Sequence, residues 1–424
     1  MKKLLMCSAA CVLGLAVAHP AKADGIKLDL AGHFKGYVTW VSESVTGATT
    51  DERHFDILRE TEIHFTGETT LDNGLTVGVH HDALIDGGTG AGGADAFLTR
   101  ESYAYFSGAW GRVNFGKEDG ANYLLQVAVP SADTNYDGLR QYVNPEGLGA
   151  FGFFGPPPIL STGGAGTGQG SGAGAGGGVR GFANTGSKLD YADDATGFAN
   201  KISYLTPVWS GFQAGASYTP SMGGALSIGG QPGGNEASTA FGVPLRNGVG
   251  TFGDAWEGAL RYEGKWQELG ITLGGGYTHV QYTTADATDQ NDAFHQWNLG
   301  AGLTWRQFGL GAVYTTDNGA LRNDGQNRTW VVGVDYTTGP FKLGASYLNN
   351  HEGLGDTTVA SGISNGQLDT SRWAPGVIYT YGPGMTFRGS VGWVRTTLPD
   401  EGGNAGIGGN AHSTDVLLGT QINF

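Results

Sequence analysis

The sequence is poor in cysteine, in charged residues and in long apolar runs. Only two of its 424 residues are cysteine, Cys7 and Cys11, and charged residues make up 15%. Beyond the N-terminus, no segment offers the roughly 18 consecutive apolar residues of a membrane-spanning helix. Helix-period apolar patterns are also scarce, while 77 residues are glycine, which disfavours helices. These absences exclude a helical membrane protein and indicate an all-β chain.

The N-terminus has the pattern of a secretory signal peptide. Lys2 and Lys3 precede an apolar stretch of 15 residues, which is short for a bilayer span, and Ala21-Lys22-Ala23 forms a small-x-small cleavage site. We expect residues 1–23 to be a cleaved signal and residues 24–424 to form a single domain.

Cleavage would leave an acidic chain without cysteine. The signal carries three lysines and no acid, so the mature chain keeps 21 of the 24 basic residues and all 39 acidic ones, a net charge of −18. An exported chain without disulfides must be held together in another way. The negative balance argues against nucleic acid as a partner and leaves room for cations.

Apolar and polar residues alternate with the period of a β-strand along the whole chain. An Asn73-Gly74 turn between two alternating runs is a strong hairpin signal. The alternation predicts sixteen strands, near 29–40, 56–66, 75–80, 98–107, 112–117, 198–206, 212–219, 254–266, 270–282, 293–306, 308–316, 328–338, 341–350, 370–381, 385–397 and 412–424.

The predicted connections alternate between short and long. Short connections such as 339–340 follow long ones such as 118–197 and 317–327. A soluble sandwich would not sort its loops by length in this way. The sorting indicates a 16-stranded antiparallel transmembrane β-barrel with short periplasmic turns and long extracellular loops. Both ends of the sheet then lie on the periplasmic side, where they can close without an exposed edge.

The two faces of the predicted strands differ as a membrane barrel requires. Within 293–306, Trp297 and Trp305 flank Leu299 and Leu303 on one parity, which is the aromatic girdle of a lipid-facing surface. The opposite parity is polar and rich in glycine. Sixteen strands enclose a lumen wide enough for water, which makes inward charges affordable.

The chain ends in a well-patterned strand, although chain ends usually fray. Such a strand suits a fold whose last strand closes the sheet. We expect one parity to face lipid, namely Val416, Leu418, Ile422 and Phe424. The other parity is expected to face the lumen, namely Asp415, Gln421 and Asn423.

Four segments and the C-terminal aromatic together resemble the Gram-negative general porins, particularly those of purple and related proteobacteria. They are 62–68 (EIHFTGE) before the Asp-Asn-Gly turn, 100–108 (RESYAYFSG), 110–117 (WGRVNFGK), 211–218 (GFQAGASY) and Phe424. The resemblance implies a homotrimer of 16-stranded barrels in the bacterial outer membrane that passes small hydrophilic solutes by diffusion. It also implies a third loop that folds partly into the lumen, with acidic residues facing basic residues on the wall.

By position, the resemblance makes 118–197 the third loop and Phe424 a signal for the outer-membrane assembly machinery. The implied acids of the constriction are Glu118, Asp119, Asp133, Asp137 and Glu146. The implied bases of the pore wall are Arg100 and Arg112, supported by Lys35, Lys201, Arg261 and Arg388 on inward parity. An ordinary solvated lumen residue is the alternative for each base.

The sequence departs from the family pattern in two places. Glu62 stands where an inward arginine is common, which would weaken the basic side of the pore and favour cations. The third loop is unusually long and holds a glycine-rich insert at 163–178, which cannot bury enough surface to order itself. We expect the insert to be a tether outside the pore or a plug over it.

Metal and nucleotide motifs are weak in this sequence. His80 and His81 are adjacent and point to opposite faces of a strand, so they make a poor metal pair. Asp190, Asp193 and Asp194 suit calcium, but we favour solvated surface charge. Acids of the outer loops could also bridge lipopolysaccharide through divalent ions.

These features favour a passive, water-filled diffusion channel with a mild preference for cations. A substrate-selective channel of the same fold, for a sugar or another specific solute, is the alternative. An adhesin that uses the glycine-rich segment is a third reading. We expect no enzymatic activity, because no nucleophile and base are placed together, and no cofactor.

Overall fold

The structure is a computed structural model, and it describes most of the chain from residue 25 onward. The described residues are 25–45, 54–85, 98–133, 136–137, 139–141, 189–222, 251–283, 292–320, 322, 326–353, 367–398 and 409–424. The expected signal peptide (1–23), the glycine-rich insert (163–178) and Glu146 lie outside these residues.

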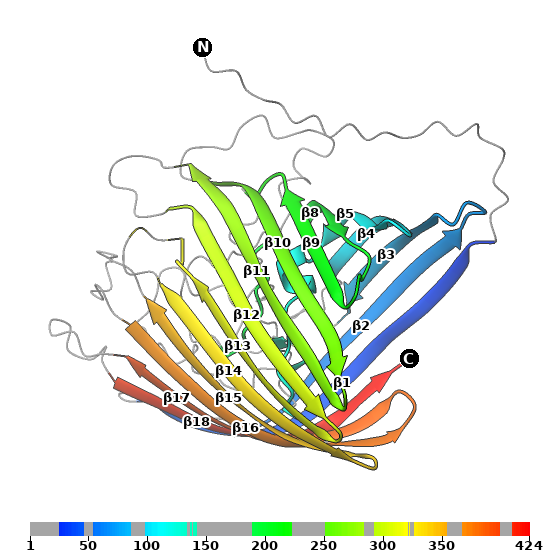
Figure 1. Ribbon diagram of the computed structural model, residues 1–424. Helices are drawn as coiled ribbons and strands as arrows, with labels where there is room; N and C mark the ends of the chain where they lie inside the picture. The colour runs from blue at the N-terminus through cyan, green and yellow to red at the C-terminus, as the bar shows by residue number, and fades with distance from the viewer. Residues whose placement is uncertain are drawn as a thin grey trace.

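Sixteen antiparallel strands among the described residues form one closed barrel, as the sequence predicted (Figure 1). They are β1 (Lys27–Val45), β2 (Phe55–Thr70), β3 (Thr76–Leu84), β4 (Leu98–Gly108), β5 (Gly111–Glu118), β8 (Ala199–Leu205), β9 (Phe212–Thr219), β10 (Thr251–Trp266), β11 (Leu269–Thr283), β12 (Phe294–Trp305), β13 (Phe308–Asp317), β14 (Asn327–Thr338), β15 (Phe341–Gly353), β16 (Gln367–Gly382), β17 (Met385–Leu398) and β18 (Gly409–Asn423). Each strand pairs with its neighbours in the chain, and β1 pairs with β18.

The pairing of β1 with β18 closes the barrel. The register runs from His33 opposite Asn423 to Val45 opposite Ala411. At its end, the Gly32 N–H donates to the Phe424 carbonyl at 2.8 Å and the Phe424 N–H donates to the Gly32 carbonyl at 3.0 Å. The last strand is therefore hydrogen-bonded to the final residue of the chain.

The connections are sorted between the two ends of the barrel, which we call the turn end and the loop end. The turn end carries short connections, such as the turn between β2 and β3, where Gly74 has a φ of +80° that favours glycine. At the loop end, several strands run past their predicted limits, since β1 continues to Val45 and β15 to Gly353. Above the hydrocarbon both faces of a strand meet water, so the apolar alternation fades while the hydrogen-bonded ladder continues.

The connection from β5 to β8 contains three short elements that the sequence did not predict. They are α1 (Ala121–Leu124) and a two-stranded sheet of β6 (Tyr136–Asp137) and β7 (Arg140–Gln141). No helix among the described residues is long and apolar enough to cross a membrane.

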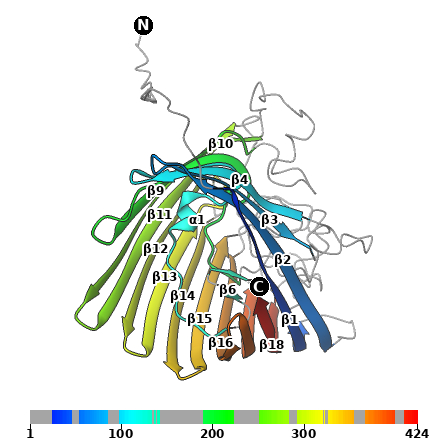
Figure 2. The ribbon, with the colours of Figure 1, turned by 90° about the vertical axis from the view of Figure 1, so that its right-hand side faces the viewer.

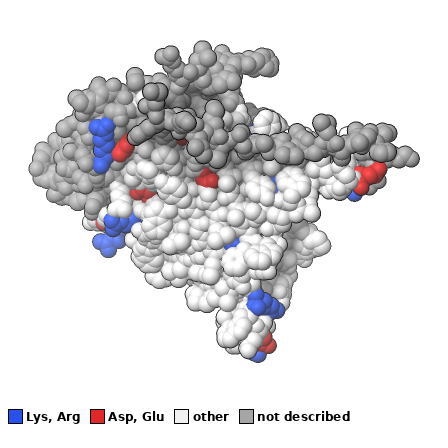
Figure 3. All heavy atoms as spheres, turned by 45° about the horizontal axis from the view of Figure 1, so that its top comes forward, with Lys and Arg blue, Asp and Glu red and all other residues white. Residues whose placement is uncertain are grey.

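The outer surface of the barrel is apolar and aromatic, and the inner surface is polar. On β12, Leu299 is 58% exposed between the outward-facing Trp297 and Trp305, whereas Asn298 is buried. On β18, Leu418 is 60% exposed and Asp415 is fully buried, which is the alternation that the sequence predicted. On the face shown in Figure 3, the described surface between the two ends is almost free of charge.

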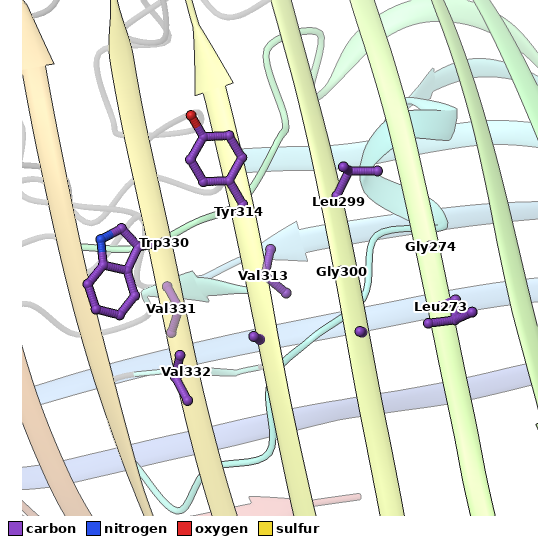
Figure 4. A pocket seen from close by; sticks show the side chains of 11 residues that line it. Leu273, Gly274, Leu299, Gly300, Val313, Tyr314, Trp330, Val331 and Val332 are labelled. Atoms are coloured by element: carbon purple, nitrogen blue, oxygen red, sulfur yellow. The ribbon is translucent and has the colours of Figure 1, made fainter.

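A shallow groove of about 420 Å³ crosses the outer face of β11 to β14 (Figure 4). Leu273, Leu299, Tyr314, Trp330 and Val332 border it. Its walls are apolar side chains. The groove can therefore contact the hydrocarbon of a membrane, as the apolar surface around it does.

Replacing Phe424 with alanine tests the role of the C-terminal aromatic. Its ring faces outward and is 57% exposed, while its backbone holds β18 to Gly32. If Phe424 is the assembly signal that the resemblance implies, Phe424→Ala should lower the outer-membrane yield several-fold. Alanine keeps the backbone pairing with Gly32, so we expect the conductance of assembled channels to be unchanged. Phe387→Ala, which removes another outward aromatic of this barrel, is the control. A normal yield with altered conductance would contradict the prediction.

Candidate functional site

Residues 119–133, which we call the inner limb, leave β5 and enter the barrel (Figure 2). Near its start the limb forms α1 (Ala121–Leu124), which contacts β8 to β11. The Ala121 N–H donates to Ser217 Oγ at 2.8 Å, and Asn122 Nδ2 donates to Thr278 Oγ1 at 2.9 Å. Both acceptors are inward residues of the wall, so α1 is fixed to the barrel by buried hydrogen bonds.

Beyond α1, the inner limb lies against a row of inward glycines that we call the glycine track. One glycine comes from each of six neighbouring strands, β11 to β16: Gly274, Gly300, Gly311, Gly333, Gly344 and Gly376. A Cβ at Gly300 would lie 2.6 Å from Val127 Cβ, and one at Gly311 would lie 2.7 Å from Pro130 Cδ. The limb can therefore lie on the wall only because these positions carry no side chain.

Residues 189–198, which we call the return limb, pack on the inner limb. Gln126 Nε2 donates to the Tyr191 carbonyl at 2.7 Å, and Gln126 Oε1 accepts from the Asp193 N–H at 2.9 Å. The Tyr191 hydroxyl accepts from the Val129 N–H at 3.0 Å, and burial raises the pKa of Tyr191 above its usual range. The two limbs thus form one hydrogen-bonded unit inside the barrel.

The aspartates of the return limb do not lie on a solvated surface, and our interpretation of them was wrong. Asp190, Asp193 and Asp194 are 1%, 0% and 5% exposed. Asp193 Oδ2 accepts a hydrogen bond from Asn298 Nδ2 of β12 at 2.9 Å. Packing between the limbs and the wall removes these carboxylates from bulk water, which sequence spacing alone could not show.

The end of the inner limb is held by a buried ion pair. Arg372 of β16 binds Asp133 with both terminal nitrogens, and the Nη2–Oδ1 distance is 3.1 Å. The side chains are 1% and 0% exposed. Arg372 was not among the residues predicted from the sequence, although its inward parity beside the outward Trp373 was a usable signal.

The two arginines expected on the pore wall both contact the wall itself. Arg100 Nη1 donates to Glu62 Oε2 at 3.0 Å, and its guanidinium lies 5.0 Å from the centre of the Phe198 ring. The Arg112 guanidinium lies 4.0 Å from the centre of the Tyr105 ring, a cation–π geometry. Both side chains point inward, and Glu62 compensates the charge of Arg100.

The four supporting bases also have partners inside the barrel. Lys201 is buried and its Nζ donates to the carbonyls of Glu118, Thr196 and Ala199. Arg261 Nη1 reaches the Gln126 carbonyl of the inner limb at 2.9 Å. The other two contact their own wall, as Lys35 Nζ lies 4.0 Å from Glu60 Oε1 and Arg388 Nε donates to Thr386 Oγ1 at 3.2 Å.

The acids expected at the constriction occupy different environments. Glu118 ends β5, is buried, and accepts from Asn114 Nδ2 at 2.7 Å. Asp119 begins the inner limb and is also buried, and Asp133 binds Arg372. Asp137 lies in β6.

A further set of inward side chains covers the wall of β1 to β4, and no motif in the sequence marked this wall as a site. They include the histidines and acids His33, Glu60, Glu62, His64, Glu68, His80, Asp82 and Glu101. Because each lies on a strand, its position is fixed by the register of the barrel. Two bases, Lys35 and Arg100, lie among these residues. The carboxyl groups on this part of the wall therefore outnumber the bases.

Comparison with known proteins identifies one family. The family model described as Gram-negative porin matches residues 8–398. An uncharacterized protein of Rickettsia prowazekii is 26% identical over 264 residues, which are 50% of this chain and 59% of that relative. The match thus spans less than two thirds of the relative's length.

Solved structures share the fold at low sequence identity. The anion-selective porin from Comamonas acidovorans has a TM-score of 0.54 at 18% identity, covering 94% of this chain and 100% of its own. The outer membrane channel DcaP of Acinetobacter baumannii has a TM-score of 0.56 at 12% identity, covering 94% and 98%. In-vitro folded OmpT of Vibrio cholerae in its trimer form has a TM-score of 0.53 at 12% identity, covering 95% and 100%.

The buried ion pair gives a prediction about stability. Replacing Arg372 with methionine leaves Asp133 buried without its guanidinium, so we expect Arg372→Met to cost about 3–5 kcal/mol of unfolding free energy. The double variant with Asp133→Leu should recover most of that loss. Arg306→Met removes an exposed ion pair and should cost less than about 1 kcal/mol. Urea unfolding of the detergent-solubilised barrel measures all three, and an unchanged midpoint for Arg372→Met would refute the prediction.

The glycine track gives a prediction about the inner limb. The Cβ of Gly300→Ala would collide with Val127, and we expect the overpacking to cost about 1–3 kcal/mol and to displace the limb. Gly258→Ala is the matched control, because a Cβ there meets nothing within 4 Å. Single-channel recordings should show a higher or noisier conductance for Gly300→Ala alone. Identical traces from both variants would mean that the limb does not depend on the track.

Proposed function

The chain belongs to the Gram-negative porin family, whose members are outer-membrane channels, and from that premise we propose that it passes small hydrophilic solutes and ions by passive diffusion with a mild preference for cations. The observation that carries the proposal is the closed barrel with an apolar, aromatic outer surface and a charged inner wall. Only such a sheet satisfies every backbone group in lipid while enclosing a polar interior.

The inner limb acts in this proposal as the element that narrows the lumen. It lies on the wall of β8 to β16 and is held at both ends, by α1 and by the ion pair of Asp133 with Arg372. Solutes therefore pass beside the limb, along the part of the wall that β1 to β5 provide. The short connections of the turn end face the periplasm.

The preference for cations rests on the carboxylates of that wall. Glu60, Glu62 and Glu101 are inward on β2 and β4, and Glu62 already compensates Arg100. A negative wall raises the local concentration of cations and lowers that of anions. The Comamonas porin with a similar fold is described as anion-selective, but at 18% identity this likeness concerns the fold alone.

We assign no reaction to the chain, since the porin family and fold are generally non-enzymatic. A homotrimer is part of the proposal, and the trimer form of the Vibrio cholerae OmpT structure is consistent with it. Lipopolysaccharide and the outer-membrane assembly machinery are its further partners, on the strength of the family resemblance.

A substrate-selective channel is the second candidate. Aromatic side chains that point into the lumen would support it, and the support comes from one part of the wall. Tyr103 and Tyr105 stand inward beside Arg112. Liposome swelling with solutes of equal size and different chemistry separates the two functions. Rates that follow size alone support diffusion, and a strong preference for one chemistry at equal size supports selectivity. Purified protein that forms no channels in planar bilayers would refute both.

Replacing Glu62 with glutamine tests the cation preference. The change removes a negative charge from the lumen and releases Arg100 from its partner, so we expect the cation-to-anion permeability ratio to fall by about two-fold or more. Reversal potentials in a salt gradient measure the ratio. Glu268→Gln is the control, because Glu268 lies exposed at a short turn and pairs with Arg306. A ratio that is equal in both variants would count against a selective role for the wall carboxylates.

A further inference from the structure

His33, Glu62 and His64 form a compact cluster on the inner wall near the closure of the barrel. His33 of β1 lies directly opposite Glu62 of β2, and His64 is the next inward residue of β2. Period-two alternation points all three side chains to the lumen. Their placement is set by two paired strands, which hold ligands more precisely than a loop does.

The side-chain atoms of the cluster are already close together. Glu62 lies between the two histidines, with His64 Nε2 at 3.4 Å from Oε1 and His33 Nε2 at 3.8 Å from Oε2. One nitrogen or oxygen of each residue lies within 4.8 Å of the others. Glu60 adds a second carboxylate, with Oε1 at 3.1 Å from His33 Nε2.

This geometry fits a divalent transition metal. Imidazole nitrogens and carboxylate oxygens bind Zn²⁺ at about 2.0–2.2 Å, which places neighbouring tetrahedral ligands about 3.4 Å apart. The two glutamate–histidine separations, 3.4 and 3.8 Å, lie close to that value, and rotation of a side chain can supply the difference. Two histidines and one carboxylate leave the fourth position to Glu60 or to water.

The charges around the cluster favour a cation. The carboxylates of Glu60, Glu62 and Glu101 lie on this wall, whereas Arg100 and Lys35 are the bases within about 4 Å of Glu62 and Glu60 among the described ion pairs. A divalent ion at Glu62 competes with Arg100, because both need the same carboxylate. Displaced from Glu62, Arg100 retains its contact with the Phe198 ring.

The cluster is open to the lumen. The His64 side chain is 31% exposed and that of His33 is 12% exposed, while that of Glu62 is 7% exposed. An ion can reach the histidines from water and then bind the more buried carboxylate. The neighbouring His80 packs beside His64, with ring centres 5.7 Å apart. The Nδ1 atom of His80 forms a hydrogen bond with Thr66 Oγ1 at 3.0 Å.

We propose that His33, Glu62 and His64 form a binding site for a divalent transition-metal ion, with Zn²⁺ as the reference ion, on the inner wall of the barrel. A bound ion adds two positive charges beside the solute path and opposes the wall carboxylates. The site does not depend on the channel activity, because binding can be measured on the folded protein in detergent.

Titration of the purified full-length barrel with Zn²⁺ tests the site. We expect one ion per chain at this site, and a loss of affinity of more than about ten-fold for His33→Gln, His64→Gln and Glu62→Gln. His81→Gln is the matched control, because His81 follows His80 on the same strand but faces outward, opposite Phe65. Its affinity should equal that of the unmodified protein.

A second set of histidines must be separated from the site. His279 and His295 face outward with Nδ1 atoms 3.4 Å apart. The titrations are therefore repeated in a His279→Gln/His295→Gln background, where the binding assigned to the inner cluster should persist. Co²⁺ absorption gives an independent readout, since tetrahedral nitrogen and oxygen ligation produces visible bands that His64→Gln should abolish.

Heat-modifiable mobility in gels shows whether each variant is folded. Folded His33→Gln and His64→Gln barrels that bind Zn²⁺ as tightly as the unmodified protein would overturn the proposal. Absence of any Zn²⁺ or Co²⁺ binding by the folded unmodified barrel would also overturn it. Channels that conduct but bind no metal would leave the proposed function intact.

Discussion

The closure of β1 on β18 is the interaction on which the rest of the structure depends. In hydrocarbon no water can satisfy an unpaired N–H or C=O group, so an open sheet edge would be too costly. The continuous register from His33 to Val45, completed by the paired Gly32 and Phe424, removes that edge. Closure also creates two environments at once, an outer surface that must be apolar and an inner one that can hold water and charge.

The sequence predicted this architecture well because each strand carries the signal locally. The outward Trp297, Leu299 and Trp305 of β12 specify lipid contact without reference to any other strand. Errors arose at the loop end, where β1 and β15 continue above the hydrocarbon and the alternation no longer marks them. The face of each residue in β18 followed from the same parity.

The candidate site was harder to predict, because its contacts join distant segments. A glycine such as Gly333 reveals nothing about the main chain that will lie on it, and Asp133 is 239 residues from Arg372. Inward residues such as Glu62 could be identified one by one from parity, whereas Arg100 shares the outward parity of Phe106 and points inward at the register shift between β3 and β4. Which of them contact one another depends on the register and stagger of neighbouring strands, and on the path of the inner limb.

The glycine track also sets an order of assembly. The limb is tethered to β5, but the surface that receives it is spread over β11 to β16 and ends at Arg372. That surface is complete only when β11 to β16 are paired in one sheet. Docking of the limb therefore follows the pairing of these strands. The number and stagger of the strands set the diameter of the wall, whereas the limb sets how much of the enclosed cross-section stays open.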